Sequence, residues 1–206
     1  MLRVGLTGGI ASGKSTVAAM LRSRGCDVLE MDPIGHRFLE PGQPAYNEVL
    51  REFGRETLTS SGSIDRAKLA AVIFADPAKR VRLNAILHPR ILDVVRKWFD
   101  ALDRPGGPHF AVVEAALILE AGYHTELDRI IVCWCPPDQQ LQRLERRGLS
   151  PEQAQARISA QMPMDDKREL ADDVIDCSKS LSQTQQAVDN LIARLNQLAE
   201  VRGNIS

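Results

Sequence analysis

The fold of the chain is decided by residues 8–15, which read Gly8-Gly9-Ile10-Ala11-Ser12-Gly13-Lys14-Ser15. They match the pattern G-x-x-x-x-G-K-[ST] at every fixed position. Glycines let such a loop turn so that successive backbone N–H groups point inward and bind an anion. Residues 2–7 are apolar enough for a short buried strand, and the residues from Ser15 to Arg24 are spaced as in an amphipathic helix. The sequence therefore predicts a phosphate-binding loop between a strand and a helix.

Two side chains behind the last glycine of the loop are suited to bind a nucleotide. Lys14 can reach the β- and γ-phosphates, and the Ser15 hydroxyl can ligate Mg²⁺. The helix that starts near Lys14 adds the positive end of its dipole. We expect the Lys14 side chain to point into a solvent-filled loop when no ligand is bound.

Composition limits the possible classes of protein. A chain of 206 residues can form one α/β domain or one domain with an inserted subdomain. Its hydrophobic content of 44% and charged content of 26% are ordinary for a globular protein. The net charge of −1 argues against a broad nucleic-acid surface. We therefore expect a protein that binds small molecules rather than nucleic acid.

The cysteines and the apolar runs predict a cytoplasmic location. Cys26, Cys133, Cys135 and Cys177 show no zinc-ligand spacing and fit a reducing compartment. The chain enters a strand at once, which leaves no room for a signal peptide. The best apolar run, residues 110–119, is too short to span a membrane and contains a glutamate. We expect no membrane association.

Beyond the loop, strand and helix patterns alternate along the chain. Four further strands are expected at residues 26–32, 109–119, 128–135 and 171–177, and a closing amphipathic helix at 181–201. Residues 33–103 carry helical spacing and little strand character. Asp76 should cap a helix, Ser150 should begin another in a capping box, and Pro89 should break or kink its helix. The order predicts a doubly wound α/β fold, with a parallel five-stranded sheet and a helical insert.

Asp32 is a candidate for catalysis. At the carboxyl end of the second predicted strand it would face the phosphates across the crevice of a parallel sheet. A carboxylate there can accept a hydroxyl proton or hold Mg²⁺-bound water. Alternatively, Asp32 caps the helix that Pro33 would begin, and both roles are compatible.

An arginine-rich helical segment follows the fourth predicted strand. Arg143, Arg146 and Arg147 share a helix face, and Arg157 and Gln161 repeat the spacing on the next helix. Beside a phosphate loop, we interpret residues 138–168 as a mobile lid over a triphosphate rather than a solvated face. His88 is either a contact to a substrate phosphate or a structural residue.

The ordered motifs make the chain resemble the dephospho-coenzyme A kinases. Their opening G-L-T-G-G-I-x-S-G-K-S appears as residues 5–15, with Ala11 where glycine is common. The similarity runs from Leu2 to about Val201. The later matches are Asp32, Asp65-Arg66, Leu69, Phe74-x-Asp76-Pro77, His88-Pro89-x-Ile91, Gln140-Leu141-x-Arg143-Leu144, Arg146-Arg147, Arg157, Gln161-Met162-Pro163, Lys167 and Ala171-Asp172-x-Val174-Ile175-Asp176.

The resemblance implies a P-loop kinase that transfers the γ-phosphoryl group of ATP, with Mg²⁺, to the ribose 3′-hydroxyl of dephospho-CoA, the last step of CoA synthesis. It implies a CoA-binding subdomain at residues 33–103 within one domain of residues 1–206, and a protein that is a monomer or a weak homo-oligomer. The implied catalytic residues are Asp32, Lys14 and Arg143. ATP would be bound by Gly9, Ile10, Ala11, Ser12, Gly13, Lys14, Ser15, Thr16, Arg143 and Arg147. Dephospho-CoA would be bound by Asp32, Arg66, His88, Glu120 and Arg157, and Mg²⁺ by Ser15 and by Asp32, the latter directly or through water.

The sequence departs from the family pattern in three segments. The family's D-A-D is Glu30-Met31-Asp32, so only the last acid matches, and its P-L-L-[FV]-E is residues 116–120, Ala-Leu-Ile-Leu-Glu. Its N-S-G after the last strand is Cys177-Ser178-Lys179, at the place where the family's backbone meets the nucleotide base. The last departure therefore bears on selectivity for the nucleotide base and not on phosphate binding.

Two other classes of protein share the loop motif. A GTPase could use Asp32-Pro33-Ile34-Gly35 as its D-x-x-G, but the N-K-x-D tetrapeptide that reads guanine does not occur in the sequence. A non-catalytic nucleotide-binding module would leave Asp32 and the lid arginines idle. Turnover with ATP and dephospho-CoA distinguishes these classes from a kinase.

Overall fold

The computed structural model describes residues 1–203, which divide into two compact units. Unit 1 comprises residues 1–29 and the chain from residue 99 onward, and unit 2 comprises residues 30–98. The strands are β1 (Leu2–Gly8), β2 (Asp27–Glu30), β3 (Phe110–Glu114), β4 (Arg129–Trp134) and β5 (Asp173–Asp176). The helices are α1 (Lys14–Ser23), α2 (Met31–Phe38), α3 (Tyr46–Phe53), α4 (Arg66–Ala75), α5 (Pro77–Leu102), α6 (Pro137–Glu145), α7 (Pro151–Ser159), α8 (Met164–Glu169) and α9 (Leu181–Gly203), with short 3₁₀ turns η1 (Arg55–Thr57) and η2 (Tyr123–Glu126).

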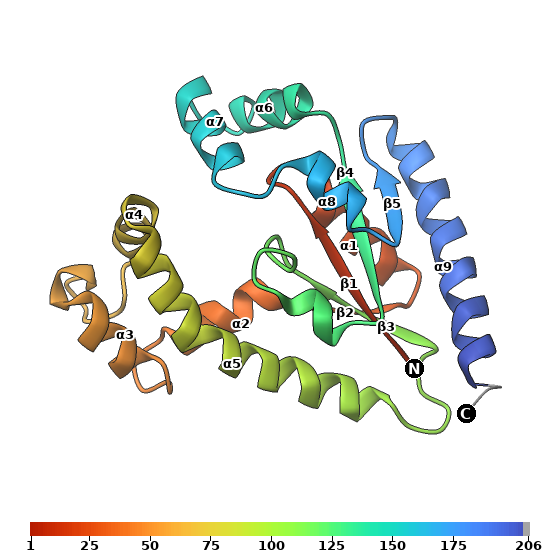
Figure 1. Cartoon of the computed structure of the whole chain (residues 1–206), viewed down its shortest axis with the longest axis horizontal. Helices are drawn as coiled ribbons and strands as arrows, with labels where there is room; N and C mark the ends of the chain where they lie inside the picture. Colours follow the sequence, from red (N-terminus) through yellow and green to blue (C-terminus); the bar gives the residue numbers. More distant parts are fainter. Residues whose placement is uncertain (204–206) are drawn as a thin grey trace. The chain divides into compact units, whose positions relative to one another are not determined.

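The five strands form one sheet in the order β2-β3-β1-β4-β5 (Figure 1). β1 pairs in parallel with both β3 and β4, and β4 pairs in parallel with β5. The predicted five-stranded parallel sheet is therefore confirmed. Because the chain crosses from one side of β1 to the other between β3 and β4, the carboxyl end of β1 lies at a topological switch point, where α/β folds bind ligands.

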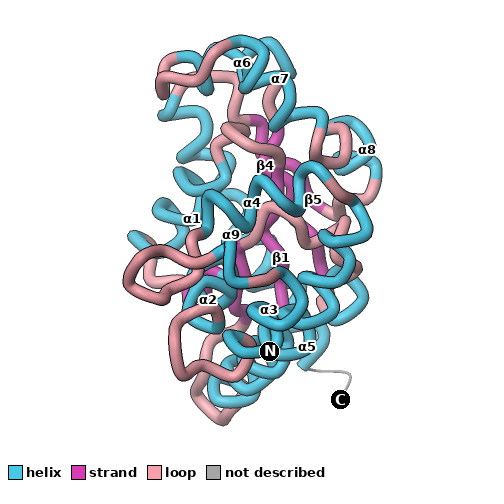
Figure 2. The backbone as a smooth tube through the Cα atoms, turned by 90° about the vertical axis from the view of Figure 1, so that its left-hand side faces the viewer, coloured by secondary structure: helices cyan, strands magenta, loops and turns pink. Residues whose placement is uncertain are grey.

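The core of unit 1 lies between the sheet and two helices, α1 and α9. Val17 and Leu21 of α1 and Leu191 of α9 are buried against strand residues such as Val4 and Ile131. These apolar side chains recur at helical spacing on α1 and α9 and at alternate positions on the strands, which explains why the elements form and pack together. The helices surrounding the strands can be followed in Figure 2.

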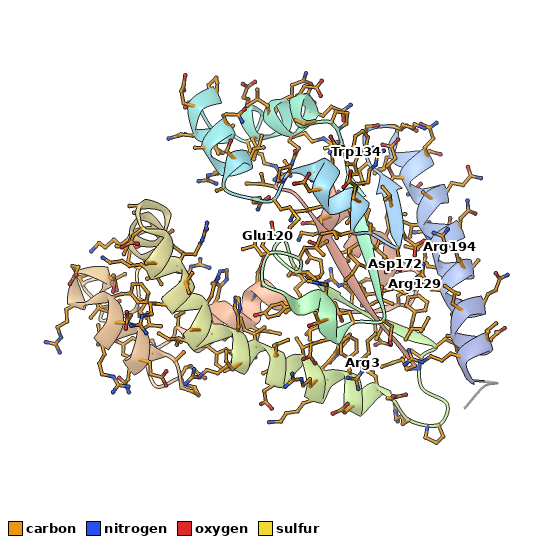
Figure 3. All side chains as sticks on the ribbon, in the orientation of Figure 1. Arg3, Glu120, Arg129, Trp134, Asp172 and Arg194 are labelled. Atoms are coloured by element: carbon orange, nitrogen blue, oxygen red, sulfur yellow. The ribbon has the colours of Figure 1, made fainter. Side chains whose placement is uncertain are left out.

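Charged side chains at the β4–β5 side of unit 1 join strands to α9. The buried Asp173 carboxylate accepts a hydrogen bond from Arg129 Nε at 3.3 Å and also pairs with Arg194 of α9. Arg129, Asp172 and Arg194 are labelled on this side in Figure 3. The pairs fix the position of β5, the last strand of the sheet.

Unit 2 has a small helical core of its own. Val49 and Phe53 of α3, Leu69 of α4 and Leu83 of α5 are buried together with Leu39. The expected cap at Asp76 is present, because Asp76 Oδ1 accepts a hydrogen bond from the Ala78 amide at 2.9 Å. Residues 33–103 were expected to show helical patterns and little strand character, and among the described residues there the only β-pairing is a single antiparallel bridge between Leu58 and Ile64.

Of the break or kink expected at Pro89, the break does not occur, because α5 runs from Pro77 to Leu102 with Pro89 inside it. A proline in a helix interior costs about 3 kcal/mol through a lost hydrogen bond and a steric clash. The apolar face of α5 continues past it, with Leu83 buried before the proline and Ile91 and Val95 buried after it. Burying each such side chain stabilises the fold by about 1.5–3 kcal/mol, so the three together outweigh the cost of the proline.

All four strands predicted after the first are shorter in the structure. The second ends at Glu30, and Asp32 lies in the first turn of α2 instead of on the strand. The third ends at Glu114, and the remaining apolar run turns away from the sheet, with the Gly122 amide donating to the Leu119 carbonyl at 3.1 Å. Buried turns and buried strands share the same apolar composition, so periodicity could not separate them. Within residues 1–203, no helix has the length and apolarity needed to cross a membrane.

Candidate active site

The phosphate-binding loop connects β1 to α1, as the motif predicts. Gly13 has a φ of 109°, and a Cβ atom there would lie 2.8 Å from Cys177 Cβ, so both the backbone angle and the space require glycine. Ala11 has a φ of 59° and is the one residue other than glycine with positive φ among residues 1–203. The loop borders a cavity of about 310 Å³ that is lined by Gly9, Ile10, Ala11, Ser12, Gly13, Lys14, Ser15, Thr16, Ala116, Arg147 and Gln161. All eight loop positions expected to bind ATP therefore surround one cavity.

The environment of the loop suits an anion. Lys14 begins α1, so the first-turn amides of the helix and its positive dipole end face the loop. The Ser12 hydroxyl is buried and finds no hydrogen-bond partner among the described residues. A buried donor without a partner is costly, and a phosphate oxygen would satisfy it. The loop is built to receive phosphate.

Lys14 does not point into solvent, and that expectation is wrong. Its ammonium forms an ion pair with the Glu114 carboxylate, and the two side chains are only 12% and 8% exposed. The pairing arises because β3 runs beside β1, with Glu114 opposite Leu6, so the carboxyl end of β3 lies next to the loop. These two charged groups can be buried because the attraction between them offsets the cost of removing each from water. Glu114 is therefore a residue of the site that the motif did not reveal.

The arginine-rich segment contacts the loop through its backbone. Arg143 Nη1 donates to the Ala11 carbonyl at 3.0 Å, and Nη2 donates to the Cys177 carbonyl at 2.6 Å. Arg143 is thereby fixed between the phosphate loop and the end of β5. Arg147 is exposed and lines the phosphate cavity, and Arg157 is exposed in the last turn of α7.

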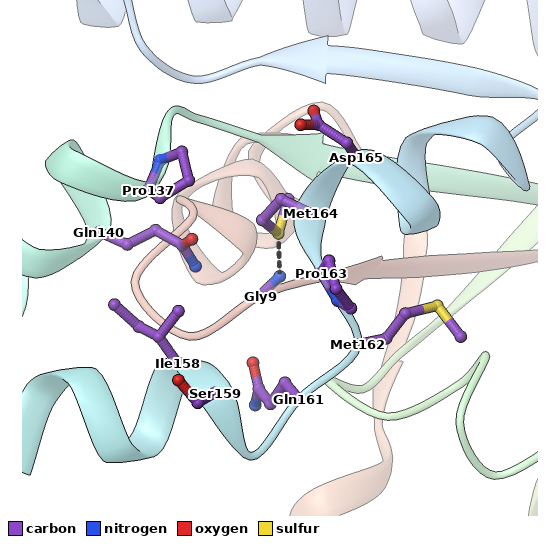
Figure 4. A pocket seen from close by; sticks show the side chains of 10 residues that line it. All are labelled: Gly9, Pro137, Gln140, Ile158, Ser159, Gln161, Met162, Pro163, Met164 and Asp165. Atoms are coloured by element: carbon purple, nitrogen blue, oxygen red, sulfur yellow. Dashed lines mark hydrogen bonds between the residues drawn. The ribbon is translucent and has the colours of Figure 1, made fainter.

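Side chains of the same segment hold the loop from its other side (Figure 4). Gln140 Nε2 donates to the Ile10 carbonyl at 2.6 Å, and the Ile10 amide donates to Gln161 Oε1 at 2.7 Å. The Gly9 amide donates to the Met164 sulfur at 3.0 Å. Sequence reasoning gave Gln140 and Met164 no role, although the spacing of Gln161 from Arg157 was noted. The capping box at Ser150 is confirmed at the start of α7, which positions this segment.

Glu120 lies on the loop after β3 (Figure 3) and has partners within the protein. Its Oε1 atom is 2.8 Å from the ammonium of Lys167, which is completely buried, and accepts a hydrogen bond from the Met162 amide at 3.1 Å. Lys167 also donates to the Ala116 carbonyl at 2.8 Å. These contacts join the loop after β3 to the segment before α8, so Glu120 has a structural role that the sequence did not predict.

Three residues expected in the site belong to unit 2: Asp32, Arg66 and His88. Asp32 is exposed at the second position of α2, and the residue before that helix is Glu30, which makes no side-chain cap. The capping role considered for Asp32 is therefore wrong. Arg66 is exposed and lies 3.0 Å from His36 Nδ1. His88 is half-buried, and this burial lowers its pKa below the usual value.

A second cavity adjoins the phosphate loop in unit 1. It has a volume of about 370 Å³ and is lined by Ala11, Gly13, Thr16, Arg143, Arg147, Cys177, Lys179, Leu181 and Thr184. Four of these residues, Ala11, Gly13, Thr16 and Arg147, also line the phosphate cavity. A nucleotide with its phosphates in the loop could extend into this space.

The residues at the loop also fit Mg²⁺. Mg²⁺ prefers oxygen ligands and in nucleotide sites takes one or two carboxylates together with substrate phosphates. Ser15 supplies a hydroxyl at the second position of α1, and Glu114 supplies a carboxylate beside Lys14. Within residues 1–203, no group of three or more His, Cys, Asp or Glu side chains is placed to hold a metal ion.

Comparison with known proteins identifies the relatives of the chain. The model of the dephospho-CoA kinase family matches residues 2–183. A dephospho-CoA kinase of Bacillus licheniformis is 42% identical over 205 residues, which cover 99% of this chain and 98% of that protein. One from Anaeromyxobacter dehalogenans is 42% identical over 193 residues, covering 93% and 91%.

Solved structures agree with the sequence comparison. The crystal structure of TT1252 from Thermus thermophilus superimposes with a TM-score of 0.81 at 34% identity, covering 94% of this chain and 97% of that one. A dephospho-CoA kinase from Campylobacter jejuni gives a TM-score of 0.69 at 26% identity, covering 95% and 97%. A shikimate kinase from Aquifex aeolicus, at 13% identity over 96% and 98% of the two chains, has a TM-score of 0.51 and shares the fold.

Proposed function

This chain belongs to the dephospho-CoA kinase family, and from that premise we propose how its residues transfer a phosphoryl group from ATP to dephospho-CoA. The enzyme is an ATP-dependent kinase of the last step of CoA synthesis. The acceptor is the ribose 3′-hydroxyl of dephospho-CoA. The observation that supports this assignment best is the phosphate loop, which ends at Lys14 with Glu114 paired to it.

ATP binds with its phosphates in the loop of residues 8–15. Its backbone amides, the Ser12 hydroxyl and the positive end of α1 receive the phosphate oxygens. Lys14 leaves Glu114 to neutralise the β- and γ-phosphates. Arg147, which lines both cavities, is placed to stabilise the charge that develops on the transferred group.

Mg²⁺ would be held by the Ser15 hydroxyl, with Glu114 released from Lys14 as a further oxygen ligand and Asp32 contributing directly or through water. When bound, the ion neutralises charge on the β- and γ-phosphate oxygens. Glu114 gains a second function in this scheme. Its carboxylate would be left buried and unpaired when Lys14 moves, unless another cation takes the place of the ammonium.

Unit 2 provides the acceptor side. We propose that residues 33–103 bind dephospho-CoA, with Arg66 and His88 contacting it, and that Asp32 orients or deprotonates the attacking hydroxyl. Exposed Asp32 and Arg66 are available for such contacts. Residues 138–168 act as the lid, in which Arg157 is a further substrate contact. The protein is proposed to work in the cytoplasm as a single domain, as a monomer or weak homo-oligomer, with neither nucleic-acid nor membrane partners.

A turnover assay tests the function as a whole. The purified chain is supplied with ATP and Mg²⁺ and with dephospho-CoA, a panel of nucleosides or shikimate, and the products are separated by chromatography. We expect phosphorylation of dephospho-CoA far above that of the other acceptors. Transfer to shikimate or a nucleoside in preference to dephospho-CoA would contradict the proposal.

The change Asp32→Asn tests the proposed catalytic acid. A general base contributes roughly 10²–10⁴ in rate, so we expect turnover to fall at least about a hundredfold with ATP binding unchanged. The melting temperature should fall only slightly, because the acid favours the dipole of α2 from its first turn. Asp76→Asn is the matched control, since it removes a carboxylate from another helix start of unit 2 while an asparagine still caps the helix. Equal turnover in the two variants would assign the catalytic acid to another residue.

A further inference from the structure

Three of the four cysteines lie directly against the phosphate loop. A Cβ atom at Gly8 would lie 3.3 Å from Cys133 Cβ, and one at Gly13 would lie 3.0 Å from Cys177 Sγ. Cys135 Sγ lies 4.0 Å from the Ala11 carbonyl oxygen. The parallel pairing of β4 with β5 explains this grouping, because it brings the carboxyl ends of both strands, where the cysteines lie, to the edge that carries the loop.

The three thiols are all buried, with Cys177 6% exposed, but they differ in their contact with a cavity. Cys133 and Cys135 are 0% exposed and line none of the cavities described above. Cys177 borders the 370 Å³ cavity, together with Arg143, Arg147 and Lys179. A group attached to Cys177 Sγ would lie beside Gly13, which lines the same cavity. The cavity holds space for a small organic molecule.

The three thiols also differ in nucleophilicity, because the thiolate is the reactive form. A hydrogen bond from the Cys133 thiol and the charge of Arg143 lower the pKa of Cys177 below the usual value, against the opposing effects of burial and Asp176. Burial raises the pKa of Cys133 well above its usual value and that of Cys135 to about 11. Burial and then Asp27 also raise the pKa of Cys26, which lies away from the loop in the segment before β2. Of the four thiols, only that of Cys177 has a pKa below its usual value.

We propose that Cys177 is a covalent-modification site for small soft carbon electrophiles, such as α,β-unsaturated carbonyl compounds, and that its modification blocks the nucleotide cavity. The sulfur attacks one alkene carbon, a carbon–sulfur bond forms as the π bond breaks, and the neighbouring carbon takes up the thiol proton by way of solvent. No group leaves, and no oxidant is needed.

Competition with nucleotide rests on the function proposed above, since the same cavity would receive ATP. The reactivity of the Cys177 thiol rests only on the contacts in unit 1. Thiol reactivity and competition with nucleotide therefore need separate measurements on one preparation of the intact protein.

Timed labelling with N-ethylmaleimide, followed by peptide mass spectrometry, measures both parts. We expect the adduct to form at Cys177 several-fold faster than at Cys26, with Cys133 and Cys135 unmodified while the chain is folded. ATP with Mg²⁺ should slow labelling of Cys177 and leave that of Cys26 unchanged, and labelled protein should lose ATP binding. Cys177→Ala should remove the fast phase, whereas Cys26→Ala should remove only the slow one.

Other results overturn the proposal. Labelling of Cys26 before Cys177, or of Cys177 only on unfolding, refutes the reactive thiol, and fast labelling that ATP does not slow refutes blockage of the nucleotide cavity. Turnover of the unlabelled protein with dephospho-CoA is measured alongside, so that a failure of the kinase assignment is seen independently. Melting temperatures show whether Cys177→Ala is folded, and Cys177→Ser replaces it if that variant melts early.

Discussion

The pairing of Lys14 with Glu114 changes what a substitution at the loop lysine should do. A motif lysine in open solvent could be removed without affecting stability. Here its removal leaves a carboxylate that is only 8% exposed without its cation. Breaking a buried pair by removing one partner costs about 3–5 kcal/mol, so stability and catalysis are linked at this residue.

Lys14→Ala is expected to lower both turnover and the melting temperature. Turnover falls because the charge opposite the β- and γ-phosphates is lost, and unfolding requires about 3–5 kcal/mol less because Glu114 is left unpaired. The double change Lys14→Ala with Glu114→Gln should recover most of the stability and none of the turnover. Kinetic assays and thermal unfolding of the three proteins separate the two effects. An unchanged melting temperature in Lys14→Ala would contradict the ion pair.

Ala11 is a second residue at which the loop departs from the expected chemistry. Its left-handed backbone costs a residue with a Cβ roughly 1–2 kcal/mol, while glycine loses about 0.5–1 kcal/mol of unfolded-chain entropy. Ala11→Gly should therefore raise the free energy of unfolding by up to about 1 kcal/mol in urea denaturation. Ala19→Gly, at an exposed position inside α1, is the control and should lower it by about 1 kcal/mol. If both substitutions lowered the free energy of unfolding, the backbone of Ala11 would not be strained.

At the scale of elements, the lid segment and the phosphate loop form one hydrogen-bonded arrangement. Gln140 and Arg143 of α6, Gln161 after α7 and Met164 of α8 all contact the backbone of residues 9–11. Movement of the lid during catalysis would therefore be transmitted to the loop that holds the phosphates. Arg143 and Arg147 should consequently respond differently to substitution.

Arg143→Ala should lower the melting temperature as well as turnover, because two backbone carbonyls lose a charged donor. Arg147→Ala should lower turnover alone, since its side chain is exposed at the cavity. An arginine acting as a finger contributes about 10³–10⁵ in rate, and for one member of a cluster we expect the low end or less. Arg146→Ala is the control, because Arg146 is exposed on the same segment and lines neither cavity. Identical kinetics in all three variants would show that the arginines of residues 138–168 form only a solvated helix face.

At the scale of the whole molecule, the two units carry different parts of the proposed reaction. The phosphate loop and the lid belong to unit 1, and Asp32, Arg66 and His88 belong to unit 2. Each unit has its own hydrophobic core. Substitutions in unit 2 should therefore act on dephospho-CoA and leave ATP binding intact.

Arg66→Ala tests this division. Losing a charged hydrogen bond to a substrate phosphate should raise KM for dephospho-CoA roughly tenfold, while KM for ATP stays unchanged. Arg80→Ala removes an exposed arginine of α5 in the same unit and should change neither constant. Steady-state kinetics with each substrate varied in turn gives both values. A rise in KM for ATP alone would contradict the assignment of unit 2 to the acceptor.

The sequence by itself determined the elements whose signals are local. The strand, glycine loop and helix at residues 2–23, the cap at Asp76 and the capping box at Ser150 all depend on residues a few positions apart, and the parallel sheet was predicted from the order of such local segments. Glycine at position 13 is likewise readable from the motif. Local hydrogen bonding and hydrophobic periodicity act within one turn or one strand, so a single sequence contains them.

Only the tertiary structure decided how distant side chains pair. Glu114 meets Lys14 because β3 and β1 align in parallel, and Glu120 meets Lys167 because α8 and the loop after β3 meet at the buried ammonium. Arg143 binds backbone carbonyls of two separate segments, a contact that no spacing encodes. Such charges are stable in the interior only when packing brings a partner within reach, and packing is a property of the assembled sheet and helices rather than of any one segment.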